Sequence, residues 1–416
     1  MRKMKDSGIA WIGEIPQDWE IMPLYCLYSE RKNINALGKE NNLLSLSYGK
    51  VVRKDINTSE GLLPSNYNGY NIVECDDIII RPTDLQNDKR SLRTGLAKER
   101  GIITSAYIAL KPKQGVNSHY FHYLLHSYDI SKVFYNMGNG VRQGLNYDEF
   151  AKLIMLVPSN LEQQRIADFL DKECEKIDEL KADIQTQIDM LEQYKRSAIT
   201  EAVTHGLNLN VPMKDSGVDY IDKIKADWKI SKIGFVCTKL TRGFSEDDPA
   251  LICSNKGNVV FRDEQHACGK MVSEDNAMQG IHIGDIAIHG MDTWHGAIGF
   301  SKIRGKITRV VHVCDSTEDN RFVVYYLKSL AYQGVYKLIS NGIRSNTSDF
   351  RSWDKVKDIY ICLPPFDEQK EIADYLDKKC AEIEQIIADK NTQLDTLDDY
   401  KKSLIYEYVT GKKEAA

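Results

Sequence analysis

The 416-residue sequence lacks the features that would mark a membrane protein or a secreted one. No run of about 18 apolar residues occurs, which excludes a transmembrane helix, and no apolar signal core follows the opening residues Met1 to Asp6. The nine cysteines are scattered and never spaced as Cys-x-x-Cys, which excludes a zinc ribbon and a disulfide framework. We therefore expect a cytoplasmic protein with no membrane partner and no bound metal.

The sequence also has little of what catalysis or nucleotide binding requires. No phosphate-cradling Gly-x-x-x-x-Gly-Lys-Ser/Thr is present. The loop from Gly138 to Gly144 has one residue too many between its second and third glycines for a dinucleotide fingerprint, and it follows a helical segment. The Pro-Pro-aromatic motif of adenine methyltransferases begins with Asn, Asp or Ser, whereas this chain has Leu363 there. These absences predict a chain without catalysis of its own.

Two weaker catalytic patterns have simpler interpretations. Glu368-Gln369-Lys370 resembles half of a nuclease site, but the equivalent of Lys370 earlier in the chain is Gln164, so helix initiation is favoured. One expected helix carries three histidines on one face, and their aromatic neighbours favour partial core packing or phosphate contact over metal binding. These histidines are His119, His122 and His126.

What the sequence does have is an internal repeat of roughly 205 residues. Two copies of this length are too long for solenoid units, so each copy must contain at least one complete domain. The offsets between matching segments are 209, 206 and 202 residues. The matches are Met4–Gly8 with Met213–Gly217, Trp19 with Trp228, Pro158–Lys172 with Pro364–Lys378, and Asn139–Arg142 with Asn341–Arg344.

The most similar segments of the two copies read as long helices. Residues 160–204 contain no Gly or Pro, and Ser159 with Glu162 has capping-box spacing before them. About 45 residues give a rod of about 65 to 70 Å, which needs a partner along its length, so we expect the two helices to pair as an antiparallel coiled coil. The apolar seam consists of Leu170, Ile177, Ile184 and Leu191 in the first copy and Leu376, Ile383, Leu397 and Leu404 in the second.

One polar position in this seam has two interpretations. Gln187 and Gln393 occupy equivalent places in the two copies. They either form a polar layer that fixes the register of the pair or lie on a solvated flank.

The remaining segments predict two α/β domains. In the first copy we expect strands at 76–80 and 102–110 and a helix at 118–134; in the second, strands at 284–288 and 307–313 and a helix at 320–339. The predicted division is a lead and first domain at 1–157, a central helix at 158–206, a linker and second domain at 207–362, and a C-terminal helix at 363–416.

Charge separates these domains from the helices. The chain carries a net charge of −5, yet residues 20–155 and 229–362 each carry +3, while 156–206 and 363–416 each carry −5. Basic loops that mix Arg with Asn or Gln suit contact with phosphates and base edges, although any one cluster could be an ordinary solvated loop. The candidates are Lys50, Arg53, Gln86, Asn87, Lys89, Arg90, Arg93 and Arg142 in the first copy, and Trp294, His295, Arg304, Arg309, Arg344 and Asn346 in the second.

The order of these segments resembles the specificity subunit of type I restriction-modification systems. The residues that carry the resemblance are Ile12–Pro16 with Trp19, and the two helix starts Pro158–Lys172 and Pro364–Lys378. The resemblance covers essentially the whole chain. In the second copy, the segment Tyr220–Lys225 departs from the pattern because it lacks the Gly and Pro of the first.

The resemblance implies a division of labour in phage defence. Each α/β segment would be a target recognition domain that reads one half of a split double-stranded DNA sequence, and the paired helices would hold the two domains apart. The chain would have no catalysis and no cofactor. It would recruit two modification subunits, which bind S-adenosylmethionine and methylate adenine, and through them two restriction subunits, which are motor-nucleases using ATP and Mg.

Two other functions fit parts of the sequence. A coiled-coil scaffold that never contacts DNA would show no sequence preference in a protection assay with its partners. An adenine methyltransferase acting alone would bind its cofactor as an isolated chain. The bases that are read do not follow from the sequence, because recognition loops obey no residue-to-base code.

Overall fold

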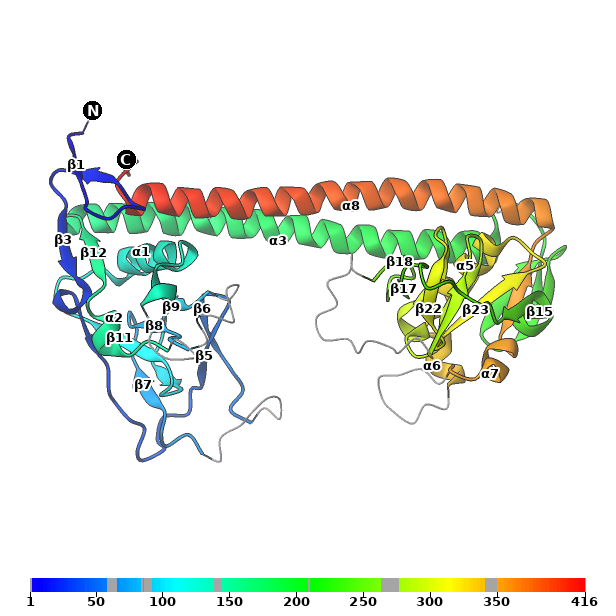
Figure 1. The fold of residues 1–416 in the computed structure, drawn as a ribbon, viewed down its shortest axis with the longest axis horizontal. Helices are drawn as coiled ribbons and strands as arrows, with labels where there is room; N and C mark the ends of the chain where they lie inside the picture. Colours follow the sequence, from blue (N-terminus) through cyan, green and yellow to red (C-terminus); the bar gives the residue numbers. More distant parts are fainter. Residues whose placement is uncertain are drawn as a thin grey trace. The chain divides into compact units, whose positions relative to one another are not determined.

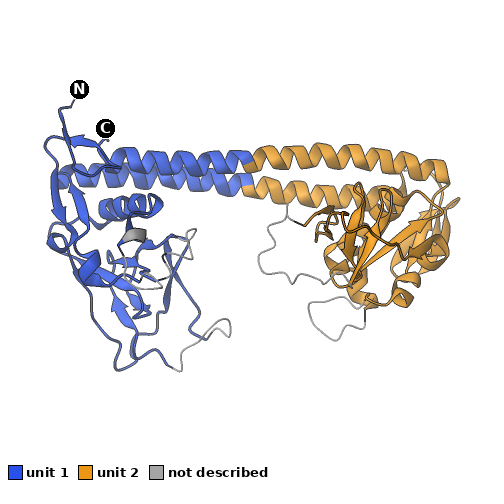
Figure 2. Ribbon diagram, viewed as in Figure 1, with its two compact units in different colours: residues 1–184, 392–416 blue, residues 185–391 orange. Residues whose placement is uncertain are grey.

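The chain forms two compact units, and each of its two long helices contributes one half to each unit (Figure 2). Unit 1 comprises residues 1–184 and 392–416, and unit 2 comprises residues 185–391. The computed structural model describes residues 2–57, 66–83, 85, 92–137, 144–208, 210–262, 277–340 and 350–415. Because the units share their helices, they cut across the four segments predicted from the sequence.

Unit 1 consists mainly of short strands, one medium helix, the beginning of the first long helix and the end of the second (Figure 1). Its elements are β1 Met4–Asp6, β2 Glu14–Pro16, β3 Glu20–Pro23, η1 Leu24–Cys26, β4 Tyr28–Glu30, β5 Leu44–Ser47, β6 Lys50–Arg53, β7 Asn71–Val73, β8 Ile78–Ile80, β9 Thr94–Leu96, β10 Gly101–Ile103, β11 Ile108–Pro112, α1 Ser118–Ile130, η2 Val133–Asn136, α2 Tyr147–Phe150, β12 Ile154–Val157, and the beginning of α3 Asn160–His205.

Unit 2 repeats this order of elements between the end of α3 and the beginning of the last helix. Its elements are β13 Met213–Val218, β14 Ile221–Lys225, β15 Lys229–Lys232, α4 Ile233–Val236, β16 Cys237–Leu240, β17 Leu251–Cys253, β18 Val259–Phe261, β19 Met278–Ile281, β20 Ile286–His289, η4 Thr293–His295, β21 Ile298–Phe300, β22 Gly305–Thr308, β23 Val311–Ser316, α5 Asn320–Tyr332, α6 Val335–Ile339, α7 Trp353–Lys357, β24 Tyr360–Leu363 and α8 Phe366–Val409.

The same sheet topology occurs in both units. The central four-stranded sheet has the order β4-β11-β8-β9 in unit 1 and β16-β23-β20-β21 in unit 2. Every named strand pair in the described parts of the chain is antiparallel. Each pair of unit 1 has a counterpart in unit 2, including the hairpins β5–β6 and β17–β18. The duplication seen in the sequence is thus a duplication of two mixed α/β domains.

Three predicted element boundaries are corrected by the structure. The predicted strand at 102–110 is two strands, β10 and β11, which a turn closed by the Tyr107 N–H donating to the Thr104 carbonyl separates. The predicted strand at 307–313 is likewise divided into β22 and β23. The predicted helix at 320–339 is interrupted at Gly334, whose φ of +74° is a left-handed conformation that ends α5 before α6 begins.

The larger apolar cluster of each unit joins the domain to the long helices. In unit 1, Trp19, Tyr120 and Phe121 pack with Leu170 of α3 and Leu404 of α8. In unit 2, Trp228, Phe322 and Tyr326 are members of a cluster that includes residues from both long helices. The helix α1 lies between the central sheet and α3 in unit 1 (Figure 1), so burial of its two faces fixes the domain against α3.

The repeated Asp-Ser-Gly of the lead segments begins at the last residue of β1 in the first hairpin and lies within β13, at the register shift between Asp215 and Val218, in the second. The Gly8 N–H donates to Asp6 Oδ1 at 2.9 Å, and the Gly217 N–H donates to Asp215 Oδ1 at 2.9 Å. Both glycines have φ near +70°, which is costly for other residues. The second hairpin therefore forms although its sequence lacks the Gly13 and Pro16 of the first.

The repeated Glu at the start of each long helix connects that helix to the lead segment. The Ser159 hydroxyl accepts a hydrogen bond from the Glu162 N–H at 3.3 Å, which is one half of the predicted capping box. The Glu162 carboxylate does not complete the box, because it accepts from Trp19 Nε1 at 3.0 Å and from Arg2. The chain thus uses the carboxylate to hold the lead segment on α3.

Candidate DNA-binding surfaces and the helices that carry them

The predicted basic loop of unit 1 divides into a buried part and a part outside the described residues. Gln86, Asn87, Lys89 and Arg90 lie outside the described residues. Arg93 is fully buried, and its guanidinium donates to the Thr83 carbonyl. The prediction that Arg93 contacts DNA is therefore corrected: this side chain holds the loop from inside the domain.

The second basic group of unit 1 is exposed and paired with carboxylates. Arg53 forms a bidentate ion pair with Glu99, and the Arg53 side chain is 72% exposed. Lys50 Nζ lies 3.3 Å from the Asp178 carboxylate of α3. Exposed pairs of this kind contribute little to stability, so both cations can exchange a carboxylate for a phosphate at small cost.

The candidates of unit 2 include both exposed and half-buried side chains. Arg304 is exposed and pairs with Asp248 at 3.2 Å, while Arg309 Nε donates to the Met278 carbonyl at 3.0 Å. His295 is exposed. Trp294 is half-buried and packs against the core of unit 2, so this candidate is less accessible to DNA than an exposed loop residue. The exposed candidates are thus Arg304, Arg309 and His295.

The remaining candidates can be located only in the sequence. Arg142, Arg344 and Asn346 lie outside the described residues, as do most residues of the glycine loop at 138–144. Their assignment to DNA contact stays a prediction.

Two ion pairs in the domains, each with a buried carboxylate and a partly exposed arginine, were not found from the sequence. Arg31 Nη2 donates to Asp77 Oδ1 at 2.9 Å, and Arg242 contacts both oxygens of Asp285 at 3.0 Å. Burial raises the pKa of Asp77, although Arg31 and the Glu74 N–H oppose the rise. Each pair connects the residue or residues just after one strand of the central sheet, β4 or β16, to the residue just before another, β8 or β20. The sequence carried one signal for these pairs, because Arg31 and Arg242 are equivalent residues of the repeat at an offset of 211 residues.

The three histidines of α1 do not form a metal site. Burial lowers the pKa of His122 to about 3 and that of His126 to about 4, so both rings are neutral near pH 7. His119 instead lies against α3, with Nδ1 at 2.9 Å from Asp171 Oδ2. Within the described residues, no group of three potential ligands is placed to hold a metal ion.

Each domain helix is tied to its long helix by a repeated Tyr–Asp hydrogen bond. The Tyr123 hydroxyl donates to Asp171 at 2.8 Å in unit 1, and the Tyr325 hydroxyl donates to Asp377 at 2.7 Å in unit 2. A second side chain of the domain helix also contacts each aspartate. This side chain is His119 in unit 1 and Arg321 in unit 2. Arg321 contacts Asp377 at 2.9 Å.

The two long helices run antiparallel within each unit. In unit 1, Lys181 pairs with Asp398 and Asp178 with Lys401, so the partner number rises as the number in α3 falls. In unit 2, Lys195 pairs with Glu384. The predicted pairing of the helices is confirmed. Six predicted seam residues are buried, namely Leu170, Ile177, Ile184, Leu376, Ile383 and Leu404, and two are partly buried, namely Leu191 and Leu397.

The polar seam position is a solvated flank. Gln187 and Gln393 are both exposed, and Gln187 accepts a hydrogen bond from Lys390 of α8. The polar-layer interpretation is therefore wrong.

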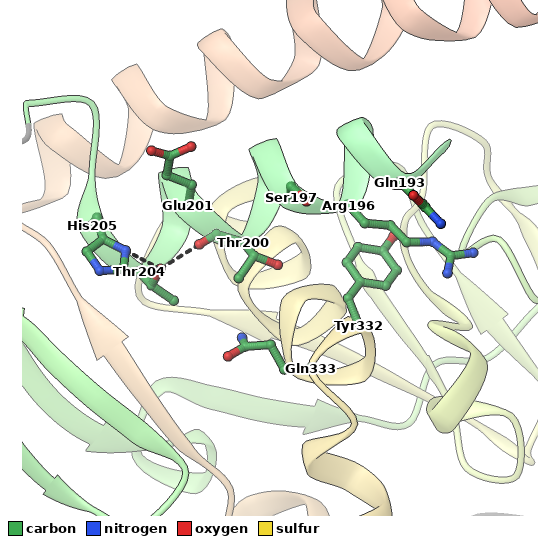
Figure 3. A pocket seen from close by; sticks show the side chains of 9 residues that line it. All are labelled: Gln193, Arg196, Ser197, Thr200, Glu201, Thr204, His205, Tyr332 and Gln333. Carbon is green, nitrogen blue, oxygen red and sulfur yellow. Dashed lines mark hydrogen bonds between the residues drawn. The ribbon is translucent and has the colours of Figure 1, made fainter. Parts of the chain in front are cut away.

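An open groove of about 810 Å³ lies between α3 and the end of α5 in unit 2 (Figure 3). Its lining includes Thr200, Thr204, His205 and Tyr332. The Thr204 hydroxyl donates to the Thr200 carbonyl at 2.6 Å, so His205 Nδ1, at 2.8 Å, must donate to that hydroxyl and cannot accept its proton. This Thr–His pair is therefore not an activated nucleophile.

Comparisons with known proteins agree with this architecture. A family model described as the type I restriction modification DNA specificity domain matches residues 92–190. A putative type I restriction enzyme MjaX specificity subunit from Methanocaldococcus jannaschii is 23% identical over 431 residues, covering 96% of this chain and 95% of the relative. Both point to DNA specificity as the class of function.

One of the similar solved structures shares the fold. A chain from a study of complex assembly and conformational transition of the type I restriction-modification system has a TM-score of 0.66 at 14% identity, covering 96% of this chain and 99% of that one. The HsdS subunit from Thermoanaerobacter tengcongensis has a TM-score of 0.47 at 13% identity, covering 98% and 100%.

The chain carries a match to the DNA specificity domain of type I restriction-modification systems at residues 92–190. It is the DNA specificity subunit of such a system, and catalysis resides in the other subunits of the enzyme. The family has no cofactor of its own. No helix among the described residues is long and apolar enough to cross a membrane.

Proposed function

We propose that this specificity subunit reads a split target in double-stranded DNA, with one half-site for each α/β domain. The observation that carries the proposal is the duplication itself, since two domains of one topology each present a different set of exposed basic side chains. In unit 1 that set includes Lys50 and Arg53, and in unit 2 it includes Arg304 and Arg309. Domains with shared frames and different surfaces suit two different half-sites.

We also propose that the helix pair sets the unread spacer between the half-sites. A helix pair with a buried seam is stiff, because its buried leucines and isoleucines hold one register. Adding one heptad to α3 and the matching heptad to α8 lengthens the pair by about 10.5 Å, which is about 3 base pairs. The half-site sequences should remain the same in such a variant.

The partner subunits bind the long helices in this proposal. Leu180 and Tyr400 are each about half exposed in unit 1, and Tyr194 and Ile386 are in unit 2. The repeat relates Leu180 to Ile386 and Tyr194 to Tyr400, so each unit offers an equivalent apolar pair on its helices. Two equivalent surfaces suit two modification subunits, through which two restriction subunits join the complex; S-adenosylmethionine, ATP and Mg would be bound by these partners.

Mapping of methylated adenines in DNA exposed to the reconstituted complex tests the proposal. We expect one methylated adenine in each half of a split sequence, with an unread spacer of constant length. The paired-heptad variant should methylate the same half-sites at a spacer about 3 base pairs longer. A scaffold without DNA contact would show no sequence preference, and an unchanged spacer in the heptad variant would refute the role of the helices.

A further inference from the structure

The glutamine of the repeated Glu-Gln pair is buried at the start of each long helix. Gln163 in the first turn of α3 is 2% exposed. Its Nε2 donates to the Pro158 carbonyl at 2.9 Å, and its Oε1 accepts from the Asn117 N–H at 3.4 Å. Asn117 is the N-cap residue of α1, and its side chain accepts from the Tyr120 N–H. One amide therefore joins the start of α3 to the start of α1.

Unit 2 repeats this arrangement with different neighbours. Gln369 is fully buried, its Nε2 donates to the Pro364 carbonyl at 2.9 Å, and its Oε1 accepts from the Asp319 N–H at 3.1 Å. Asp319 is the N-cap residue of α5. The same Nε2 also donates to Glu318 at 2.6 Å. The geometry is shared although the cap residue has changed from Asn to Asp.

An amide is suited to this place because it donates and accepts at once. Each site buries one backbone carbonyl that needs a donor and one backbone N–H that needs an acceptor. A carboxylate could satisfy only the N–H, and an apolar side chain neither group. The chemistry explains why both copies have Gln after Glu.

The glutamine helps to fix the angle between α1 and α3, because a separate hydrogen bond between these helices already fixes one point of contact. The Tyr123 hydroxyl on α1 donates to Asp171, which lies two turns further along α3 than Gln163. The Tyr–Asp contact holds α1 at one point along α3, in addition to the apolar packing between the two helices. The glutamine adds a second hydrogen-bonded point at the start of α1, beside the bond from Asn117 Nδ2 to Gln164 Oε1 at 2.8 Å, and so opposes rotation of α1 about the first point.

We propose that Gln163 and Gln369 are positioning residues for DNA recognition. Each locks its domain helix to its long helix at one angle, and so determines which spacer length between half-sites the protein accepts. This inference rests on the proposed function, in which each domain reads one half-site. Because α1 and α5 pack on the central sheets, a change in their angle moves the whole recognition surface of the domain.

Gln163→Met tests the inference in the reconstituted complex with its modification subunits. Methionine keeps the length of the side chain but makes neither hydrogen bond. Methylation rates are measured on DNA with the mapped spacer and on DNA with one base pair more or fewer. We expect the variant to lose about fivefold of the wild-type preference for the mapped spacer, the equivalent of one typical hydrogen bond, and to keep its half-site sequences.

Val73→Ala is the matched control. Val73 is fully buried in a small cluster of the same unit that contains no residue of the long helices. The substitution should destabilise the domain while leaving its attachment intact, so the spacer preference should stay at the wild-type level. Gln369→Met supplies an independent second variant with the same expected loss of preference.

The outcomes separate the inference from the proposed function. A wild-type complex without any spacer preference would refute the proposed function itself. If the wild type discriminates and both glutamine variants discriminate equally well, the positioning role is refuted. Equal loss in Val73→Ala, or failure of both glutamine variants to fold, would also overturn it, because the amides would then be structural only.

Discussion

Removal of the Glu368 carboxylate should destabilise unit 2 more than removal of its repeat counterpart destabilises unit 1. Glu368 accepts from Trp228 Nε1 at 3.1 Å and from Lys225 Nζ at 2.7 Å. The Lys225 side chain is only 5% exposed and Trp228 is fully buried. Glu368→Ala would therefore leave an ammonium group and an indole N–H in the core without their acceptor.

The magnitude follows from these burials. Breaking a buried ion pair by removing one partner costs about 3 to 5 kcal/mol, and an orphaned buried donor costs about 1 to 3 kcal/mol. These costs overlap because one carboxylate satisfies both groups, and Glu368 itself is 21% exposed, so water reaches the site. We expect unit 2 to lose about 3 kcal/mol of unfolding free energy.

The counterpart substitution provides the control. Glu162→Ala removes the same hydrogen bond from Trp19 Nε1, but the cation there is Arg2, whose side chain is 21% exposed and which also contacts Asp18. Arg2 therefore keeps an anion and access to water. We expect unit 1 to lose about 1 to 2 kcal/mol, mainly through the indole N–H.

Hydrogen exchange measured by mass spectrometry reports each unit separately. Peptides from β24 report on unit 2, and peptides from β12 report on unit 1. The additional substitution Lys225→Met in Glu368→Ala should recover part of the loss, because it removes the stranded ammonium group. A loss below about 1 kcal/mol in unit 2, or a smaller loss there than Glu162→Ala causes in unit 1, would refute the assignment of the cost to the buried cation.

Two further predictions concern the same attachments. Gly206→Ala should cost about 2 to 3 kcal/mol in a urea titration, because φ is +69° and the new Cβ would lie 2.5 Å from Lys225 Nζ; Gly217→Ala, at φ +71° with open space around it, should cost about 1 kcal/mol, and equal costs would contradict the steric argument. His119 has its pKa raised by Asp171, so their contact stabilises unit 1 at pH 6 and is lost as the pH rises through the raised pKa. Because His119 is 44% exposed, we expect a loss of about 0.5 kcal/mol by pH 8 in hydrogen exchange, absent in His119→Gln, and a pH dependence that survives this substitution would refute the contact as its source.

The long helices and the repeat were predictable from the sequence because they follow simple periodic rules. The seven-residue stripe needs no knowledge of the rest of the chain, and six of its eight named residues are buried. The Glu-Gln pair was recognised as a repeated motif, but its contacts were not. Glu162 and Gln163 bind partners more than 40 residues away in the chain, and such contacts leave no spacing signal.

The division of strands was less predictable because apolar runs conceal turns. Residues 102–110 are apolar enough to read as one strand, yet the turn at Thr104 divides them. Arg93 was misjudged for a related reason. Its place in a basic loop suggested an exposed cation, whereas a buried guanidinium can satisfy backbone carbonyls that no sequence pattern identifies.

The contrast between the two copies follows from where selection can act without breaking the fold. The glutamine amide, the Trp–Glu hydrogen bond and the Tyr–Asp contact are made with similar geometry in both units, since each satisfies buried groups that a substitution would strand. Exposed pairs such as Arg53 with Glu99 and Arg304 with Asp248 carry no such penalty. The attachments are therefore held constant while the exposed side chains change, and a duplicated frame can acquire two different recognition surfaces without losing either domain.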